Sequence, residues 1–332
     1  MTKSRSTFIT PDGYAVIRAS MLVPDRALGV EVSVLINGRA VKWALEGDIL
    51  DRSRLDRIMS FKIRKVLIRA DDEPAFRRYV ERAFDDTLSN ESSSAQQKIQ
   101  ATSSATDLAV QDILNTPEDK DTYNRSQAYF ERLGALVASL PGGLEEILAR
   151  PYAAESHDHL SHSLRVAALS VALASRLGLV SKEKDRTALV TASYLHDAAL
   201  ETAGVARAQL HSQGAVRDRV AEWKTHPMEG ARLFQGKDFV NSRVLDLIAQ
   251  HEEIPNGDGF PQGLTKAKMD PLAIVLSLVN RFEDYFERHE GKTAPALDDF
   301  IKSELGRYDL DYLTHLKAIV LQARPLEPRT KV

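Results

Sequence analysis

Histidine side chains are concentrated in one part of the 332-residue chain, where they could bind metal ions. Seven of the nine histidines lie between residues 157 and 251, namely His157, His159, His162, His196, His211, His226 and His251. Asp197 directly follows His196 and adds a carboxylate to this set. Neutral imidazoles and carboxylates are suitable ligands for iron, manganese or zinc. The chain contains no cysteine, so disulfide bonds and thiolate metal sites are excluded.

Several of these histidines occupy the apolar faces of predicted helices. His251 shares a helical face with Val244 and Ile248, and His196 shares one with Ala192. Imidazoles that face inward from separate helices can converge on a metal site in the core of a helical bundle. The alternative for each histidine is a hydrogen-bonded core residue with no ligand role.

The elements that must position these side chains are almost all helical. From residue 123 onward, apolar residues recur at helical spacing, for example in "LSHSLRVAALSVALASRLGL" and "PLAIVLSLVNRFEDYF". We therefore expect a mainly α protein whose residues 123–332 form a helical bundle. Residues 89–122 are rich in Ser, Thr, Gln and Asp, which predicts a polar linker or a solvated connecting helix.

The N-terminal residues 1–88 predict a small α+β domain with a regulatory or interaction role. Apolar and polar residues alternate in "VEVSVLI" and "RAVKWAL", on either side of Asn37 and Gly38. This arrangement is typical of a β-hairpin, because both central residues of its turn need positive φ angles. Residues 65–68 read as a buried strand, and "EPAFRRYVERAF" begins a helix with Pro74 in its first turn.

Composition and charge exclude several classes of function. The formal charge of −3 and a pI near 6.3 argue against a broad surface for nucleic acid polymers. The sequence has no apolar run long enough for a membrane-spanning helix and no signal-peptide pattern at its start. We therefore expect a cytoplasmic protein that binds neither membranes nor nucleic acid polymers.

Four blocks of sequence resemble the HD-GYP branch of the HD phosphohydrolase superfamily. These blocks are "HSLRVA", "YLHD", "HPMEGARLF" and "HEEIPNGDGFPQGL", and they occur in the family's order within about residues 145–323. The resemblance implies an HD-type helical bundle with two or three bound metal ions, usually iron or manganese. It also implies hydrolysis of cyclic di-GMP to the linear dinucleotide or GMP. Protein signalling partners and a homodimer are compatible with this resemblance.

The resemblance assigns roles to individual residues of this chain. His196 and Asp197 match the HD pair that binds metal and takes part in catalysis. The metal ligands that it implies are Asp158, His162, His196, Asp197, His226, His251, Glu252 and Asn280, with Asp158 at a third-metal position. Gly259, Phe260 and Pro261 match the GYP motif and are expected to contact the substrate.

The chain departs from the family pattern at several of these positions. Glu252 replaces a histidine, Asn256 and Asn280 replace aspartates, and Phe260 replaces the tyrosine of the motif. Leu200 replaces a lysine and Ile274 an arginine that face the substrate phosphates in the family. The alternative function is therefore a catalytically degenerate HD-GYP module that signals through protein contacts or nucleotide binding.

Overall fold

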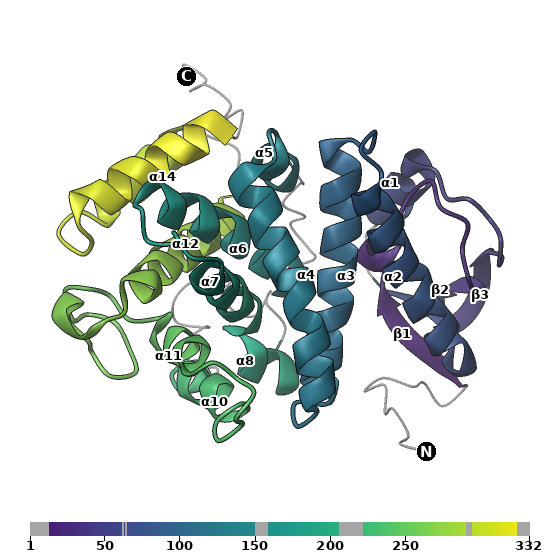
Figure 1. Ribbon diagram of the computed structural model, residues 1–332, viewed down its shortest axis with the longest axis horizontal. Coiled ribbons are helices and arrows are strands. Elements are labelled where there is room, and N and C mark those ends of the chain that lie inside the picture. The colour runs from purple at the N-terminus through teal and green to yellow at the C-terminus, as the bar shows by residue number, and fades with distance from the viewer. Residues whose placement is uncertain are drawn as a thin grey trace. The chain divides into compact units, whose positions relative to one another are not determined.

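The computed structural model describes residues 13–61, 63, 65–149, 159–205, 222–289 and 294–323. Over these residues the chain is mainly helical, and its one small sheet belongs to the N-terminal part (Figure 1), which confirms the predicted fold class. The chain divides into two compact units, Met1–Thr116 and Pro117–Val332. None of the helices in the described ranges combines the length and the apolar character needed to cross a bilayer.

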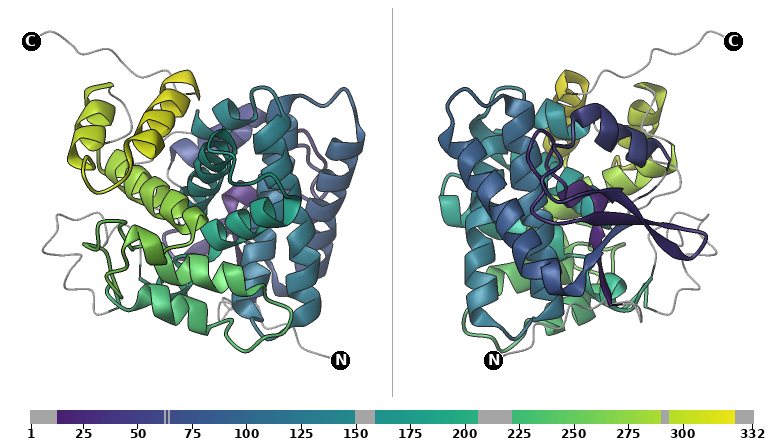
Figure 2. Two further views of the ribbon diagram at one scale, coloured as in Figure 1. Left: turned by 60° about the vertical axis from the view of Figure 1, so that its left-hand side comes forward. Right: turned by 90° about the vertical axis from the view of Figure 1, so that its right-hand side faces the viewer.

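The first unit contains a four-stranded antiparallel sheet with the strand order β1-β4-β2-β3. The strands are β1 (Tyr14–Arg18), β2 (Val32–Ile36), β3 (Arg39–Ala44) and β4 (Lys65–Arg69). Strands β2 and β3 form the predicted hairpin, seen as a twisted purple ribbon in the right-hand view of Figure 2. Asn37 and Gly38 occupy its turn with φ angles of 50° and 77°, so the Asn-Gly signal is confirmed.

The described part of the first unit also contains the α-helices α1 (Arg52–Ser60), α2 (Glu73–Ser89) and α3 (Ala95–Asn115), together with the short 3-10 helices η1 (Ala19–Met21) and η2 (Ala70–Asp72). Helix α3 fills most of the polar segment between residues 89 and 122. Residues 101–110 of α3 are buried. The polar composition of this segment had predicted a linker or a solvated helix instead. The Ser103 and Thr106 hydroxyls donate to the carbonyl oxygens of Ile99 and Thr102, four residues earlier, so these polar side chains are satisfied inside the helix.

The second unit is a helical bundle. Its helices are α4 (Lys120–Ser139), α5 (Gly143–Leu148), α6 (His159–Arg176), α7 (Glu183–Leu195), α8 (Ala198–Thr202), α10 (His226–Arg232), α11 (Ser242–Gln250), α12 (Pro271–Arg288), α13 (Ala294–Ser303) and α14 (Leu310–Ala323), with the 3-10 helix η4 (Lys266–Lys268). Helix α6 is central, because it packs against α4, α5, α7, α12 and α14. Nearly every residue of α6 from 159 to 174 is buried, as expected for a helix surrounded by others.

Capping interactions fix where two of the site helices begin. The Asn241 side chain accepts the N–H of Arg243 at the start of α11, and Asp270 accepts the N–H of Leu272 at the start of α12. The Arg243 guanidinium donates two hydrogen bonds to Asp270 and one to Asp185 of α7. These contacts tie the N-terminal ends of α7, α11 and α12 together and so set the spacing of the helices that carry the site.

Candidate metal centre

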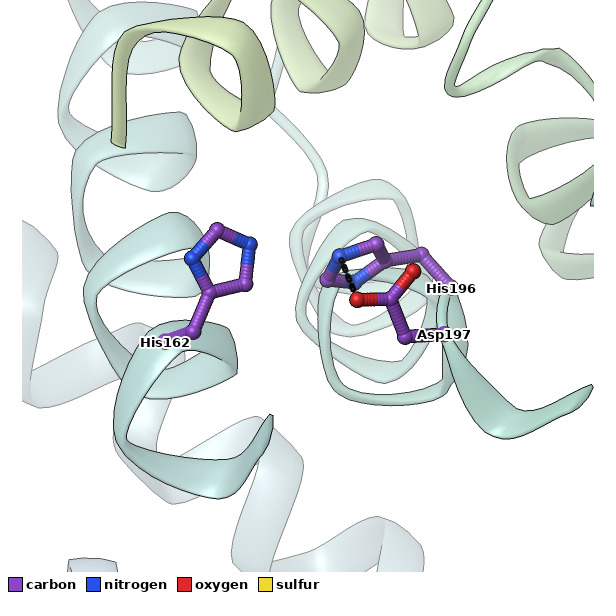
Figure 3. Close-up of side chains that lie close together, drawn as sticks. All are labelled: His162, His196 and Asp197. Carbon is purple, nitrogen blue, oxygen red and sulfur yellow. Dashed lines mark ion pairs between the residues drawn. The ribbon is translucent and has the colours of Figure 1, made fainter. Parts of the chain in front are cut away.

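Seven of the predicted ligand residues gather in the core of the second unit. His162 comes from α6, His196 and Asp197 from the junction of α7 and α8, and Asn280 from α12. His226 opens α10, and the pair His251 and Glu252 follows α11. All seven are buried, with exposed fractions of 6% or less. Figure 3 shows the part of this cluster in which His162 of α6 lies opposite the His196–Asp197 pair.

Backbone carbonyl groups orient three of the imidazoles. The Nδ1 atoms of His196, His226 and His251 each lie 2.7 Å from the carbonyl oxygen three residues earlier, on Ser193, Trp223 and Ile248. Ser193 and Ile248 lie in the last turns of their helices, where carbonyl oxygens lack an intrahelical partner. A carbonyl oxygen can only accept, so each Nδ1 carries the proton and each Nε2 presents a lone pair.

The three Nε2 atoms converge on one carboxylate. His226 Nε2 lies 3.4 Å from Asp197 Oδ1, and His251 Nε2 lies 3.9 Å from the same atom. His196 Nε2 lies 3.4 Å from Asp197 Oδ2. The Nε2 atoms of His226 and His251 are 2.8 Å apart. Two lone pairs at this distance repel unless a cation or a proton lies beside both, so the donor set fits a divalent metal ion.

Burial keeps these imidazoles in the form that binds metal. Burial lowers the pKa of His226, and the Asp197 carboxylate opposes this effect. Burial also lowers the pKa of His251 well below its usual value, and the His226 and His196 imidazoles lower it further. Metal ligation needs a neutral imidazole, so both residues are prepared for a cation near neutral pH.

The donors form two overlapping sets that share Asp197. One set is His162, His196 and Asp197, and the other is Asp197, His226 and His251; the ligand atoms within each set lie within 4.8 Å of one another. Because Oδ2 of Asp197 faces His196 and Oδ1 faces His226, the two oxygens point into different sets. A carboxylate placed in this way can bridge two metal ions.

Two comparisons with known proteins give a match to this chain. The family model for the HD domain matches residues 160–284. A solved structure of Bd1817, an HDG"Y"P protein from Bdellovibrio bacteriovorus, is 27% identical, covers 93% of this chain and 99% of that chain, and superposes with a TM-score of 0.79. No curated protein matches this chain. Residues 160–284 of this chain therefore form an HD domain. Its HD domain and HD-GYP-like relative indicate a metal-dependent phosphohydrolase of the HD family.

Glu252 and Asn280 lie beside the two candidate donor sets of the HD domain. The Asn280 amide nitrogen donates to Glu252 Oε1 over 3.1 Å, which directs Asn280 Oδ1 toward His162 Nε2 at 2.8 Å. Glu252 Oε1 lies 3.9 Å from His251 Nε2. The two residues that depart from the family pattern therefore still place an oxygen beside each donor set.

The predicted substrate motif of the HD domain lies in a loop that folds back on α11. The Glu253 carboxylate accepts the backbone N–H groups of Gln262 and Leu264 at 2.6 Å and 2.7 Å. A Cβ atom at Gly259 would lie 2.2 Å from the nitrogen of Ile254, so this close approach requires glycine. The Phe260 ring packs edge-on to His226 with ring centroids 6.3 Å apart, and Pro261 follows it through a cis peptide bond.

The predicted departures in phosphate-facing charge are visible at Leu200 and Ile274. Leu200 is fully buried and packs with Trp223, Val205 and Phe260 in an apolar cluster. Ile274 is also buried, within α12. Neither side chain supplies a cation, so this HD domain lacks positive charge at the two positions where the family has it.

Three further residues beside the metal centre were not predicted as site residues. His159 is buried with its Nδ1 3.5 Å from Asp197 Oδ2, and its Nε2 donates to the Val205 carbonyl. Asp284 and Glu287 of α12 form a third donor set with His162. The spacing of His159, three residues before His162, could have shown their common helix face, whereas the carboxylates are more than 100 residues away along the chain. Asp158 lies outside the described residues.

Proposed function

We propose that this HD-domain protein hydrolyses cyclic di-GMP, or a closely related cyclic dinucleotide, to the linear product. The observation that carries the proposal is the position of Asp197 between two sets of imidazoles, with one oxygen toward each set. A shared carboxylate of this kind would hold two metal ions close together, as two-metal hydrolysis of a phosphodiester requires. The resemblance to HD-GYP proteins supports the choice of substrate.

Two metal ions, iron or manganese, are the proposed cofactors. His162, His196, Asp197 and Asn280 would hold one ion, and Asp197, His226, His251 and Glu252 would hold the other. Nitrogen and oxygen ligands without thiolates suit these metals. When bound, the ions supply Lewis-acid activation of water and of the phosphoryl oxygens.

The residues of this chain would position the metal ligands and bury them away from solvent. Backbone carbonyls hold the imidazoles in place before any ion arrives, so little reorganisation accompanies binding. Phe260 presents an aromatic ring beside the centre that can stack on a nucleobase, and the Lys224 ammonium lies 4.5 Å from the centroid of this ring. Lys224 is thus a cation close to the place where an anionic substrate would enter.

A second candidate function follows from Leu200. Since Leu200 is buried against Trp223, the site lacks the lysine that in HD-GYP proteins faces the substrate phosphates. A protein with metals and an aromatic platform but less positive charge could bind the nucleotide without cleaving it, and signal through a protein partner or a homodimer. This alternative predicts binding without turnover.

The test is an assay of purified protein loaded anaerobically with Fe(II) or Mn(II), with cyclic di-GMP as the substrate. Linear dinucleotide and GMP are quantified, and bound metal is measured in the same samples. Asp197→Asn keeps the shape of the shared ligand and is expected to abolish turnover, whereas His289→Ala alters an exposed histidine outside the centre and is expected to leave it unchanged. Absence of turnover at full metal occupancy would refute hydrolysis, and measured nucleotide binding would then favour the second function.

A further inference from the structure

His162 is oriented differently from the other imidazoles of the metal centre. It lies near the N-terminal end of α6, where carbonyl groups accept the N–H groups of the helix itself, and not at the C-terminal end of a helix, where carbonyl groups lack such partners. The side chain is fully buried, and within the described part of the chain its Nδ1 makes no hydrogen bond. His162 therefore needs a partner other than the backbone to decide which of its nitrogens carries the proton.

One carboxylate of α12 faces this nitrogen, and a second belongs to the same cluster. Glu287 Oε2 lies 3.7 Å from His162 Nδ1, and Asp284 contributes a further oxygen to the same cluster. Asn280, Asp284 and Glu287 are spaced by four and three residues, so they share one face of α12. The helix thus presents an amide oxygen to Nε2 of His162 and negative charge to its Nδ1.

The Asn280 amide shows why this charge matters. Its nitrogen donates to Glu252, so its oxygen is the atom that faces His162 Nε2. Without a metal, that oxygen favours a proton on Nε2, which is the nitrogen that must be free to bind the ion. A carboxylate beside Nδ1 favours the opposite tautomer, because it attracts the N–H there.

We propose that Glu287 is a positioning residue that sets His162 in its metal-binding tautomer, with the proton on Nδ1 and the lone pair of Nε2 toward the metal centre. The inference rests on the proposed metal-dependent function. In this centre a side-chain carboxylate performs for His162 what backbone carbonyls perform for His196, His226 and His251. Because Glu287 contacts no ion in this scheme, it acts through His162.

Arg165 holds Glu287 in place for this role. Its guanidinium donates to Glu287 Oε1 and, over 2.8 Å, to Glu283 Oε2, and all three side chains are buried. One carboxylate oxygen of Glu287 is thereby paired with the Arg165 guanidinium, and the other faces His162 Nδ1. This pairing favours a positioning role for Glu287 over direct binding of an additional metal ion at the cluster formed by His162, Asp284 and Glu287.

The pair Glu287→Gln and Glu283→Gln provides a matched test in the full-length protein. Each variant leaves Arg165 the other of these two carboxylates, so both are expected to fold, and of the two it is Glu287 whose Oε2 lies 3.7 Å from His162 Nδ1. Imidazole nitrogen chemical shifts of the metal-free protein report the tautomer, with His162→Gln used to assign the signal. Zn(II) and Mn(II) affinities are measured by competition with a chelator.

Glu287→Gln is expected to move the His162 proton to Nε2 and to weaken metal binding about 10- to 100-fold, whereas Glu283→Gln changes neither. Glu287→Asp keeps the carboxylate but withdraws it from Nδ1, so it is expected to give an intermediate affinity. It also serves as the test if Glu287→Gln does not fold. An unchanged tautomer and affinity in Glu287→Gln would overturn the proposal, as would equal losses in both glutamine variants.

A direct metal-binding role has its own signature. Glu287→Gln and Asp284→Asn would then each remove one equivalent of bound metal without a change in tautomer, and this result would also overturn the positioning role. These measurements do not use nucleotide turnover. A protein whose metal affinity depends on Glu287 but that cleaves no cyclic dinucleotide would therefore support this inference and refute the proposed activity.

Discussion

In the metal-free protein, the two ring nitrogens of His226 and of His251 are in different situations: Nδ1 has a hydrogen-bond partner, whereas Nε2 faces a like atom. Their Nδ1 atoms donate to backbone carbonyls, and their Nε2 atoms then face each other at 2.8 Å. Burial adds to this conflict, because it makes protonation of either ring unfavourable. At the residue scale, this arrangement favours a bound cation and lowers the stability of the metal-free protein.

The stability of the metal-free protein is expected to fall as the pH is lowered from 7 to 5. In the unfolded chain these histidines bind protons near pH 6.5, whereas the folded protein keeps their pKa values lower. The unfolded state then binds more protons, so acid favours unfolding, by up to about 2 kcal/mol for His251 at pH 5. Urea unfolding across this range should show a shallower pH dependence for His251→Gln than for the wild type. An equally steep dependence would contradict the assignment, and His289→Gln serves as the control.

Asn280→Asp is expected to strengthen metal binding about tenfold, because a carboxylate attracts a divalent cation more than a neutral amide oxygen does. The same change removes the hydrogen bond to Glu252 and sets two carboxylates against each other. The metal-free variant should therefore lose about 2 kcal/mol of stability. Chelator competition and urea unfolding measure the two effects. Asn241→Asp is the matched control, since Asp caps α11 as well as Asn does, and an unchanged metal affinity in Asn280→Asp would rule out Asn280 as a ligand.

At the scale of elements, local sequence signals predicted what local interactions determine. The Asn37-Gly38 hairpin, the strand β4 and the helices of the second unit are present as expected. Strand β1 was not predicted, since its sheet position depends on pairing with β4, about 50 residues away. Burial of α3 was also missed, because serine and threonine side chains that bond within their own helix can be buried while the composition still reads as polar.

The loop after α11 depends on the absence of a side chain at Gly259. Gly259→Ala is expected to lower stability by about 3 kcal/mol, because its Cβ would meet the backbone of Ile254 and Glu253. Gly236→Ala is the control: Gly236 has a positive φ of 79° but open space around it, so only about 1 kcal/mol is expected. Urea unfolding compares the two variants, and equal losses would show that the close approach is unimportant.

At the scale of the whole molecule, the candidate metal ligands among the described residues all belong to the second unit, Pro117–Val332. A metal ion that binds the folded unit at 100 times its Kd is expected to stabilise that unit by about 2.7 kcal/mol. Differential scanning calorimetry should therefore show one transition that rises with Mn(II) and falls with chelator, while the transition of the first unit stays in place. The Asp197→Asn variant should not respond to metal, and a shift of both transitions together would contradict this view.

The family resemblance predicted seven of the side chains that the fold brings together, and six of them lie in the four blocks. It could not predict the contacts among elements that orient them. His162 meets Asn280 and Glu287 across more than 100 residues of chain, and only the packing of α6 on α12 creates these contacts. The burial of Leu200 against Trp223 likewise depends on the tertiary arrangement and on no local pattern.

The position of Trp223 gives the protein an optical indicator of its own metal content. The indole ring lies 4.9 Å from the His226 imidazole, and the other tryptophan of the chain, Trp43, belongs to the first unit. Paramagnetic Fe(II) or Mn(II) at His226 would quench the fluorescence of Trp223, whereas diamagnetic Zn(II) would not. In a Trp43→Phe variant, emission intensity would then report occupancy of the His226 side of the centre directly, without label or substrate.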